Sequence, residues 1–128
     1  MLLLDTCTLL WLAADEARLS DPARELIREN ADSLFVSAIS AFEIAVKHRK
    51  GALRLPVAPG SWFPHIVQHH GIQELPVTSG IAILSAELPL LHNDPCDRII
   101  VATAHTERLR ILTPDPLIRA YPGTEVCW

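Results

Sequence analysis

Two acidic residues stand after short apolar runs that are typical of buried strands. Asp5 directly follows Leu2–Leu4, and Asp115 follows Ile111–Leu112 after two intervening residues. In an open parallel sheet, ligands bind at the carboxyl ends of the strands, which is where both acids would lie. Each acid also has an ordinary structural explanation, because an aspartate that precedes a helix or flanks a helix-starting proline is a common N-cap. Taken singly, these positions do not decide between the two interpretations.

Two further acids border the apolar faces of predicted helices. Glu43 lies four residues after Ile39, and Asp97 lies three residues before Ile100. A carboxylate beside an apolar face must be solvated, paired or bound to a metal. The structural alternatives are an ion pair between Glu43 and Lys47 one helical turn later, and a favourable charge at the helix N-terminus for Asp97.

The segments that must position these acids alternate between short apolar runs and longer stretches of helical period. This alternation predicts an α/β fold with a parallel sheet covered by helices on both faces. Strands are expected at Leu2–Leu4, Leu34–Val36 and Ile111–Leu112, with Ile72–Leu75 at an edge and Thr124–Cys127 as a weak last strand. Helices are expected at Pro22–Ala31, Ala38–Lys50, Ser61–His70, Thr78–Leu88 and Cys96–Arg108, with a further helix starting near Thr6 or Cys7.

In such a sheet the four acids converge on one edge. Four carboxylates in one site repel one another unless cations are present. Hard cations with oxygen ligands meet this need, and Mg²⁺ is the first expectation, with Mn²⁺ as an alternative. The acidic set therefore predicts a metal site that uses Asp5, Glu43, Asp97 and Asp115.

Composition narrows the class of protein. The 128 residues correspond to one domain, and no apolar run approaches the roughly 18 residues needed to cross a bilayer. The opening apolar run lacks a basic leader and is interrupted by Asp5, so we expect a cytoplasmic protein with no membrane contact. The net charge of −4 argues mildly against a nucleic-acid partner, but bound cations would reverse the local field. The three cysteines have no metal-ligand spacing and are interpreted as small buried side chains.

The order and spacing of four short motifs resemble those of the PIN-domain nucleases, and among them the VapC-type toxins of bacterial toxin–antitoxin pairs. The resemblance covers nearly the whole chain, and it is the ordered set that is specific, since each motif alone is weak. Cys96 departs from the pattern, where relatives commonly carry an aromatic or other apolar residue, and we expect this to affect packing only. The motifs are Leu2–Thr6, Ser37–Ile44, Asn93–Ala104 and Leu112–Asp115.

The resemblance implies a single PIN domain over residues 1–128, with three α/β/α layers and a mostly parallel sheet of about five strands. It also implies Mg²⁺- or Mn²⁺-dependent endonucleolytic cleavage of RNA, a homodimer, and inhibition by a cognate VapB-type antitoxin. The family's acidic set matches Asp5, Glu43, Asp97 and Asp115. Asp5 and Asp97 match its core metal ligands, while Glu43 and Asp115 would bind a second ion or orient water.

Other roles and other classes of protein stay open at this point. Arg98 could contact the phosphate of a substrate, or pair with a neighbouring acid. Lys47–Lys50 has the composition of a solvated helix end. A catalytically inactive RNA- or protein-binding module would use the same fold, although the complete acidic set disfavours it. A signalling receiver domain needs a late lysine, and the only lysines are Lys47 and Lys50.

Overall fold

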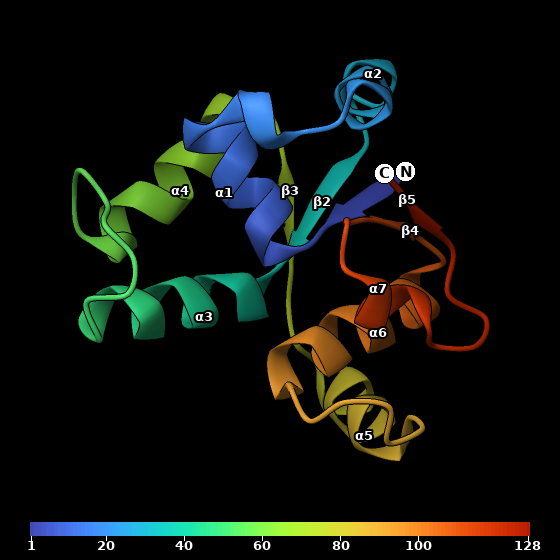
Figure 1. Ribbon diagram of the computed structural model, residues 1–128. Helices are drawn as coiled ribbons and strands as arrows, with labels where there is room; N and C mark the ends of the chain where they lie inside the picture. Colours follow the sequence, from blue (N-terminus) through green and yellow to red (C-terminus); the bar gives the residue numbers. More distant parts are fainter.

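The computed structural model describes all residues from Met1 to Trp128. Strands and helices alternate along most of the chain (Figure 1). In chain order they are β1 (Leu2–Leu4), α1 (Thr6–Ala14), the 3₁₀ helix η1 (Glu16–Arg18), α2 (Asp21–Glu29), β2 (Leu34–Ser37), α3 (Ala38–Arg49), α4 (Pro59–His69), β3 (Gln73–Leu75), α5 (Ser79–Glu87), α6 (Pro95–Glu107), β4 (Arg110–Leu112), α7 (Pro116–Arg119) and β5 (Val126–Cys127).

The five strands form one sheet in the order β3-β2-β1-β4-β5, and every neighbouring pair is parallel. This confirms the predicted α/β fold with its five-stranded parallel sheet. The central strand β1 is in register with β2 and β4, so that Leu4 pairs with Val36 on one side and Leu112 on the other. The carboxyl ends of these three strands therefore lie at the same edge of the sheet.

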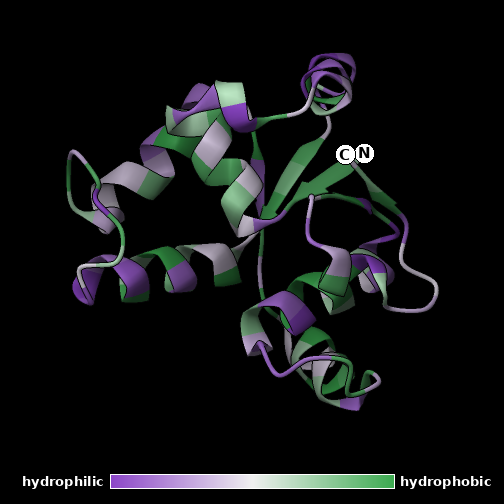
Figure 2. Cartoon of the chain, in the orientation of Figure 1, coloured by the Kyte–Doolittle hydropathy of each residue, from purple (hydrophilic) through white to green (hydrophobic).

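Alternation along β1 divides the core into two layers. Leu2 and Leu4 are fully buried among residues of α1, α2 and α4, whereas Leu3 is fully buried among residues of α5, α6 and α7. This is the period of two that places successive strand residues on opposite faces. Figure 2 shows the central strands β1 and β2 as apolar, whereas α2 on the outside is largely hydrophilic. The structure is a three-layer α/β/α sandwich (Figure 1).

Helix α3 lies between the two layers. Its Ile44 is buried in the core that contains Leu4, while Ile39 packs against the core that contains Leu3. The helix begins at the end of β2, where Ser37 accepts a hydrogen bond from the backbone N–H of Ile39. A cap of this kind contributes about 1 kcal/mol. The cap and both packed faces fix α3 beside the carboxyl edge of the sheet.

The sequence-based prediction missed two short elements, η1 and α7. Helix α4 begins at Pro59, two residues before the expected start, because proline fits the first turn of a helix. The final strand is shorter than expected and covers only Val126–Cys127. None of the helices has both the length and the apolar character needed to cross a membrane.

Candidate active site

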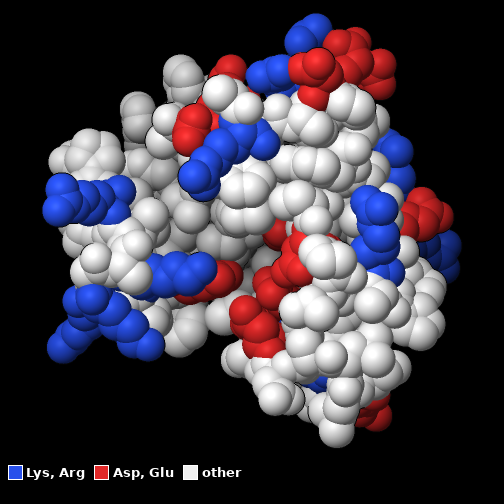
Figure 3. Space-filling view, viewed as in Figure 1, with Lys and Arg blue, Asp and Glu red and all other residues white.

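The four acids singled out in the sequence line one pocket of about 200 Å³. It lies at the carboxyl edge of the sheet, between the starts of α1 and α6 and the second turn of α3. Figure 3 shows acidic side chains gathered in the hollow between α3 and α6, with basic side chains on its outer side along α3. The lining residues are Asp5, Thr6, Cys7, Leu10, Glu43, Lys47, Asp94, Asp97 and Asp115.

Asp5 serves as a helix cap and also faces this pocket. Its carboxylate accepts a hydrogen bond from the backbone N–H of Thr8 at 2.9 Å, and another from the hydroxyl of Thr113. Only 4% of the residue is exposed. Burial raises the pKa of Asp5, and the hydrogen bonds from Thr113 and Thr8 partly oppose the rise. The buried carboxylate is thus held in one orientation by donors on both sides.

Glu43 is attached to α1 by a side-chain hydrogen bond. The hydroxyl of Thr6 donates to Oε1 of Glu43 at 2.7 Å, and it also lies 2.9 Å from the hydroxyl of Ser40. The other oxygen, Oε2, lies 3.0 Å from Nζ of Lys47. The ion pair considered in the sequence is therefore present, and it lies within the pocket instead of on a solvated face. Lys47 is the only basic residue among those that line the pocket.

Asp97 shows most directly how the acids affect one another. It lies in the first turn of α6. Burial, followed by the negative charges of Asp94, Glu43, Asp115 and Asp5, raises the pKa of Asp97 to about 8. A carboxyl group that keeps its proton at neutral pH marks a region of strong negative potential. A cation bound there would relieve this repulsion.

Asp94 is a fifth acid of the pocket, and it is not among the four acids that the sequence analysis singled out. Its carboxylate accepts the backbone N–H of Cys96 at 2.9 Å and so begins α6. Asp115 likewise both lines the pocket and caps a helix, because its carboxylate accepts the backbone N–H of Leu117 at 2.9 Å at the start of α7. Asp94 caps the same helix that carries Asp97 in its first turn, and this proximity is the signal that could have identified Asp94.

The donor chemistry of the pocket suits a hydrated Mg²⁺ or Mn²⁺ ion. All the charged side chains that line the pocket are carboxylates except Lys47, and carboxylates are the ligands that hard cations prefer. No three His, Cys, Asp or Glu side chains are close enough together to enclose an ion. This argues against a closed zinc-type cage, whereas Mg²⁺ keeps several waters and needs few direct protein ligands. Burial and the charge of Asp5 also raise the pKa of the Cys7 thiol, which disfavours a thiolate ligand.

Arg98 does not line this pocket, and its position disfavours the expected contact with substrate. The side chain is buried, and its guanidinium donates to the carbonyl oxygens of Ser85, Leu88 and Pro89, at 2.8 Å each, and to the hydroxyl of Tyr121. The three carbonyls belong to the end of α5 and the residues after it. Contact with a phosphate would require Arg98 to leave these acceptors, so its role is to join α5 to α6.

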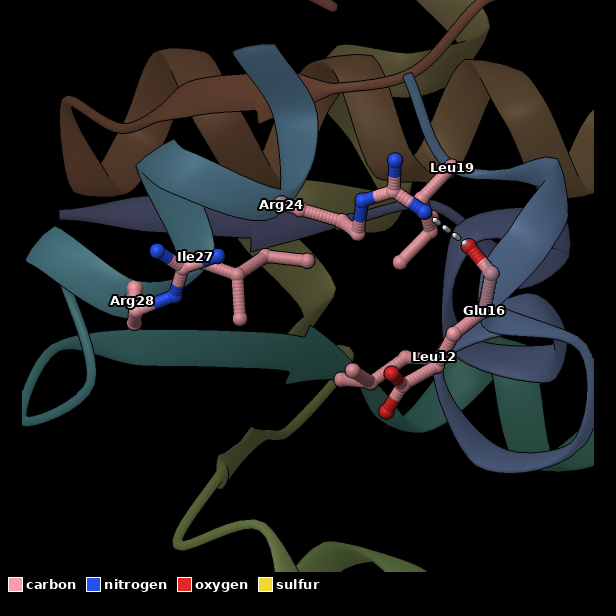
Figure 4. A pocket seen from close by; sticks show the side chains of 6 residues that line it. All are labelled: Leu12, Glu16, Leu19, Arg24, Ile27 and Arg28. Carbon is pink, nitrogen blue, oxygen red and sulfur yellow. Dashed lines mark hydrogen bonds between the residues drawn. The ribbon is translucent and has the colours of Figure 1, made fainter. Parts of the chain in front are cut away.

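A second hollow, of about 160 Å³, lies between α1, η1 and α2 (Figure 4). Its only acidic residue is Glu16, and its two arginines come from α2. The guanidinium of Arg24 points across the hollow and donates to the carbonyl oxygen of Glu16 at 3.3 Å. This hollow has no set of converging carboxylates, so the pocket at the sheet edge is the candidate active site.

A parallel sheet between helices, with an acidic pocket at its carboxyl edge, defines an α/β domain whose candidate site lies at the ends of the strands. Residues 2–123 match the model of the PIN domain family. The chain is also 34% identical over 120 residues to Ribonuclease VapC22 of Mycobacterium tuberculosis, an alignment that covers 93% of this chain and 90% of that protein. The chain therefore belongs to the PIN domain family.

Solved structures with the same fold include two VapBC complexes bound to DNA. The complex from Rickettsia felis matches with a TM-score of 0.74 and 13% identity, and the complex from Salmonella typhimurium with 0.73 and 18%. Each match covers 98% of this chain and 96% of the other. A toxin–antitoxin complex from Klebsiella pneumoniae matches with a TM-score of 0.68 and 19% identity, over 100% of this chain and 97% of the other. At these identities the matches establish the fold alone.

Proposed function

We propose that this protein is a Mg²⁺-dependent endoribonuclease that acts as the toxin of a toxin–antitoxin pair. The observation that carries the proposal is the single pocket that five carboxylates line, with the pKa of Asp97 raised to about 8. The similarity to Ribonuclease VapC22 over nearly the whole of both chains supports RNA as the substrate. Mn²⁺ is the alternative ion because it shares the preference for oxygen ligands.

Asp5 and Asp97 would hold the ion directly. Both are largely buried and line the same pocket, with Asp5 just before α1 and Asp97 in the first turn of α6. Glu43 and Asp115 would bind a second ion or orient water through their carboxylates. A bound Mg²⁺ supplies an activated water and neutralises charge on the phosphate. Lys47, beside Glu43, supplies a fixed positive charge at the pocket.

The test is cleavage of RNA by the purified protein with Mg²⁺, with Mn²⁺ and with EDTA. Wild-type protein should cleave only with a divalent ion, and Asp5→Asn and Asp97→Asn should each reduce cleavage by at least about 100-fold while circular dichroism stays unchanged. Asp32→Asn is the matched control, because Asp32 is exposed and does not line the pocket. Cleavage by Asp5→Asn at the wild-type rate would refute the assignment. RNA binding without cleavage by the wild type would support the inactive-module alternative.

An antitoxin of VapB type is the proposed protein partner. The VapC22 relative and the VapBC complexes that share this fold support a two-component system. If the proposal is correct, a small reading frame beside the gene should encode a protein that co-purifies with this chain and suppresses its RNase activity. Co-expression followed by affinity purification measures both properties, and a neighbouring product that neither binds nor inhibits would contradict the pairing.

The homodimer is proposed from exposed apolar side chains on one side of the molecule. Ile83 on α5, Leu90 after it and Leu117 on α7 are 61%, 85% and 49% exposed. Both helices cover the same face of the sheet, and exposed apolar surface of this kind is typical of protein interfaces. Light scattering should give twice the chain mass, and Leu90→Glu combined with Leu117→Glu should give the monomer.

A further inference from the structure

His92 lies behind Asp97, in the segment that joins α5 to α6. Its side chain is only 9% exposed and contacts polar groups on both edges of the ring. Nδ1 lies 2.8 Å from the hydroxyl oxygen of Tyr121, and Nε2 lies 3.6 Å from Oδ2 of Asp97. His92 does not line the acidic pocket, so it reaches the site only through Asp97.

The direction of the hydrogen bond between Tyr121 and His92 is set by Arg98. The guanidinium has donors only, so it must donate to the hydroxyl oxygen of Tyr121, which lies 3.2 Å away. Tyr121 is 1% exposed, and its own proton has one acceptor within hydrogen-bond distance, Nδ1 of His92. Tyr121 therefore donates to Nδ1, and the ring proton of His92 is on Nε2.

The Nε2 atom is buried and has no hydrogen-bond partner within normal distance. A buried N–H that is left unpaired costs about 1–3 kcal/mol, so structures rarely keep one without a reason. The acceptor that it faces is the carboxylate of Asp97, and 3.6 Å is less than an ångström beyond an ordinary hydrogen bond. A small movement of the Asp97 side chain is enough to close this gap.

We propose that His92 is a positioning residue for the metal site: the chain Arg98–Tyr121–His92 directs an N–H at Oδ2 of Asp97 and so holds that carboxylate for the ion. This inference rests on the proposed function, because it assigns Asp97 as a metal ligand. When the gap closes, His92 would hold one oxygen of Asp97 from behind, and the other oxygen would remain free for an ion. Partners behind a metal ligand commonly change metal affinity by about 10–100-fold.

Two substitutions of His92 separate the effect of losing the N–H donor from the effect of changing the size of the side chain. The amide nitrogen of glutamine can occupy the place of Nε2, whereas that of asparagine is too near the backbone to do so. Binding of Mn²⁺ to RNA-free protein, measured by calorimetry, should weaken by about 10-fold or more in His92→Asn. His92→Gln should recover most of that loss. The matched control is His105→Asn, since His105 bonds to Thr124 in a part of α6 away from the pocket.

Tyr121→Phe keeps the test decisive if His92→Asn does not fold. It removes only the hydroxyl that fixes the proton on Nε2, and we expect it to weaken Mn²⁺ binding in the same direction. Raising the Mn²⁺ concentration should restore RNA cleavage by both variants, because the metal affinity and not the reaction step is altered. The inference is refuted if His92→Asn or Tyr121→Phe binds Mn²⁺ like the wild type, or if His92→Gln is as weak as His92→Asn.

The same experiment separates this inference from the proposed function. If the wild type cleaves RNA with Mn²⁺ but the His92 variants bind the ion normally, the role of His92 is wrong and the function stands. If the variants weaken Mn²⁺ binding and the wild type cleaves no RNA, the role of His92 stands and the function is wrong.

Discussion

The buried hydroxyl of Thr113 donates a hydrogen bond to the carboxylate of Asp5, and it joins the end of β4 to the start of α1. The same oxygen accepts the backbone N–H of Asp115 at 3.1 Å. A single side chain thus orients one acid of the site and fixes the backbone of another.

Replacement of Thr113 by valine should lower both stability and metal affinity. The change keeps the shape of the side chain but leaves a buried carboxylate without one of its donors, which costs about 1–3 kcal/mol. Urea unfolding and Mn²⁺ calorimetry measure the two effects. Thr103→Val is the control, because Thr103 is equally buried but donates only to the carbonyl oxygen of Ile99. Equal metal affinity in the two variants would contradict the role given to Thr113.

Metal binding should release protons near neutral pH. The pKa of Asp97 is raised to about 8 from the ordinary 3.8, so in the metal-free protein its carboxyl group is mostly protonated at pH 7. An ion binds the charged form, and apparent affinity should therefore increase as the pH rises toward about 8 and level off above it. Calorimetry at pH 7 in two buffers of different ionisation enthalpy measures the protons released.

The same shift predicts how metal-free stability depends on pH. Between pH 3.8 and about 8 the folded protein binds more protons at Asp97 than the unfolded chain does. Its contribution to the free energy of unfolding is therefore fully present at low pH and is lost as the pH rises through this range. Asp97→Asn should remove this pH-dependent contribution. The free energy of unfolding of the variant, minus that of the wild type, should therefore be larger at pH 8 than at pH 5. Thermal unfolding in EDTA tests this, and an equal difference at the two pH values would contradict it.

The hydrogen bond from Thr6 to Glu43 should fix the orientation of the Glu43 carboxylate, and it should have little effect on the charge of that group. Thr6→Val removes the donor at 2.7 Å from Oε1 of Glu43 and should weaken Mn²⁺ binding or slow cleavage. Thr6→Ser keeps the hydroxyl and should restore most of the loss. If serine and valine have the same effect, the methyl group of Thr6 and not its hydrogen bond is what matters.

Loss of the Arg98 side chain should destabilise the fold severely. Arg98→Met removes the guanidinium donor from the carbonyl oxygens of Ser85 and Leu88 and one of the two donors to Pro89, and we expect a loss of about 3 kcal/mol or more in the free energy of unfolding. Arg49→Met, at the exposed end of α3, should change it by less than about 0.5 kcal/mol. An Arg98→Met protein of wild-type stability with a raised KM for RNA would instead support a phosphate contact.

The sequence predicted the fold well because its signals are local and agree with one another. The run Leu2–Leu4 is entirely apolar, which indicates a buried strand. Capping residues such as Ser37 and Asp94 mark where helices begin. The rule that parallel strands end at a common edge then brings Asp5 and Asp115 together without any knowledge of distances. Glu43 was harder to assign, since its ion pair with Lys47 and its place in the pocket are both present.

What the sequence could not predict depends on contacts between distant segments. Arg98 follows Asp97 by one residue, but successive helix residues differ in direction by about 100°, so that Arg98 points to α5 while Asp97 points to the pocket. Nothing near His92 in the sequence indicates that it contacts Tyr121, because that contact depends on how the segment before α6 packs on the residues that follow α7. Thr113 gained its role in the same way, from pairing between β1 and β4.

The bond between Thr113 and Asp5 also bears on when the protein becomes active. These residues are 108 positions apart, and Asp5 has its full set of donors only after β4 has paired with β1. A ribosome that is still translating this chain therefore carries a segment whose first acid is not yet held in place. The candidate site would therefore be complete only after the segment that contains Thr113 has been synthesised and has paired with β1.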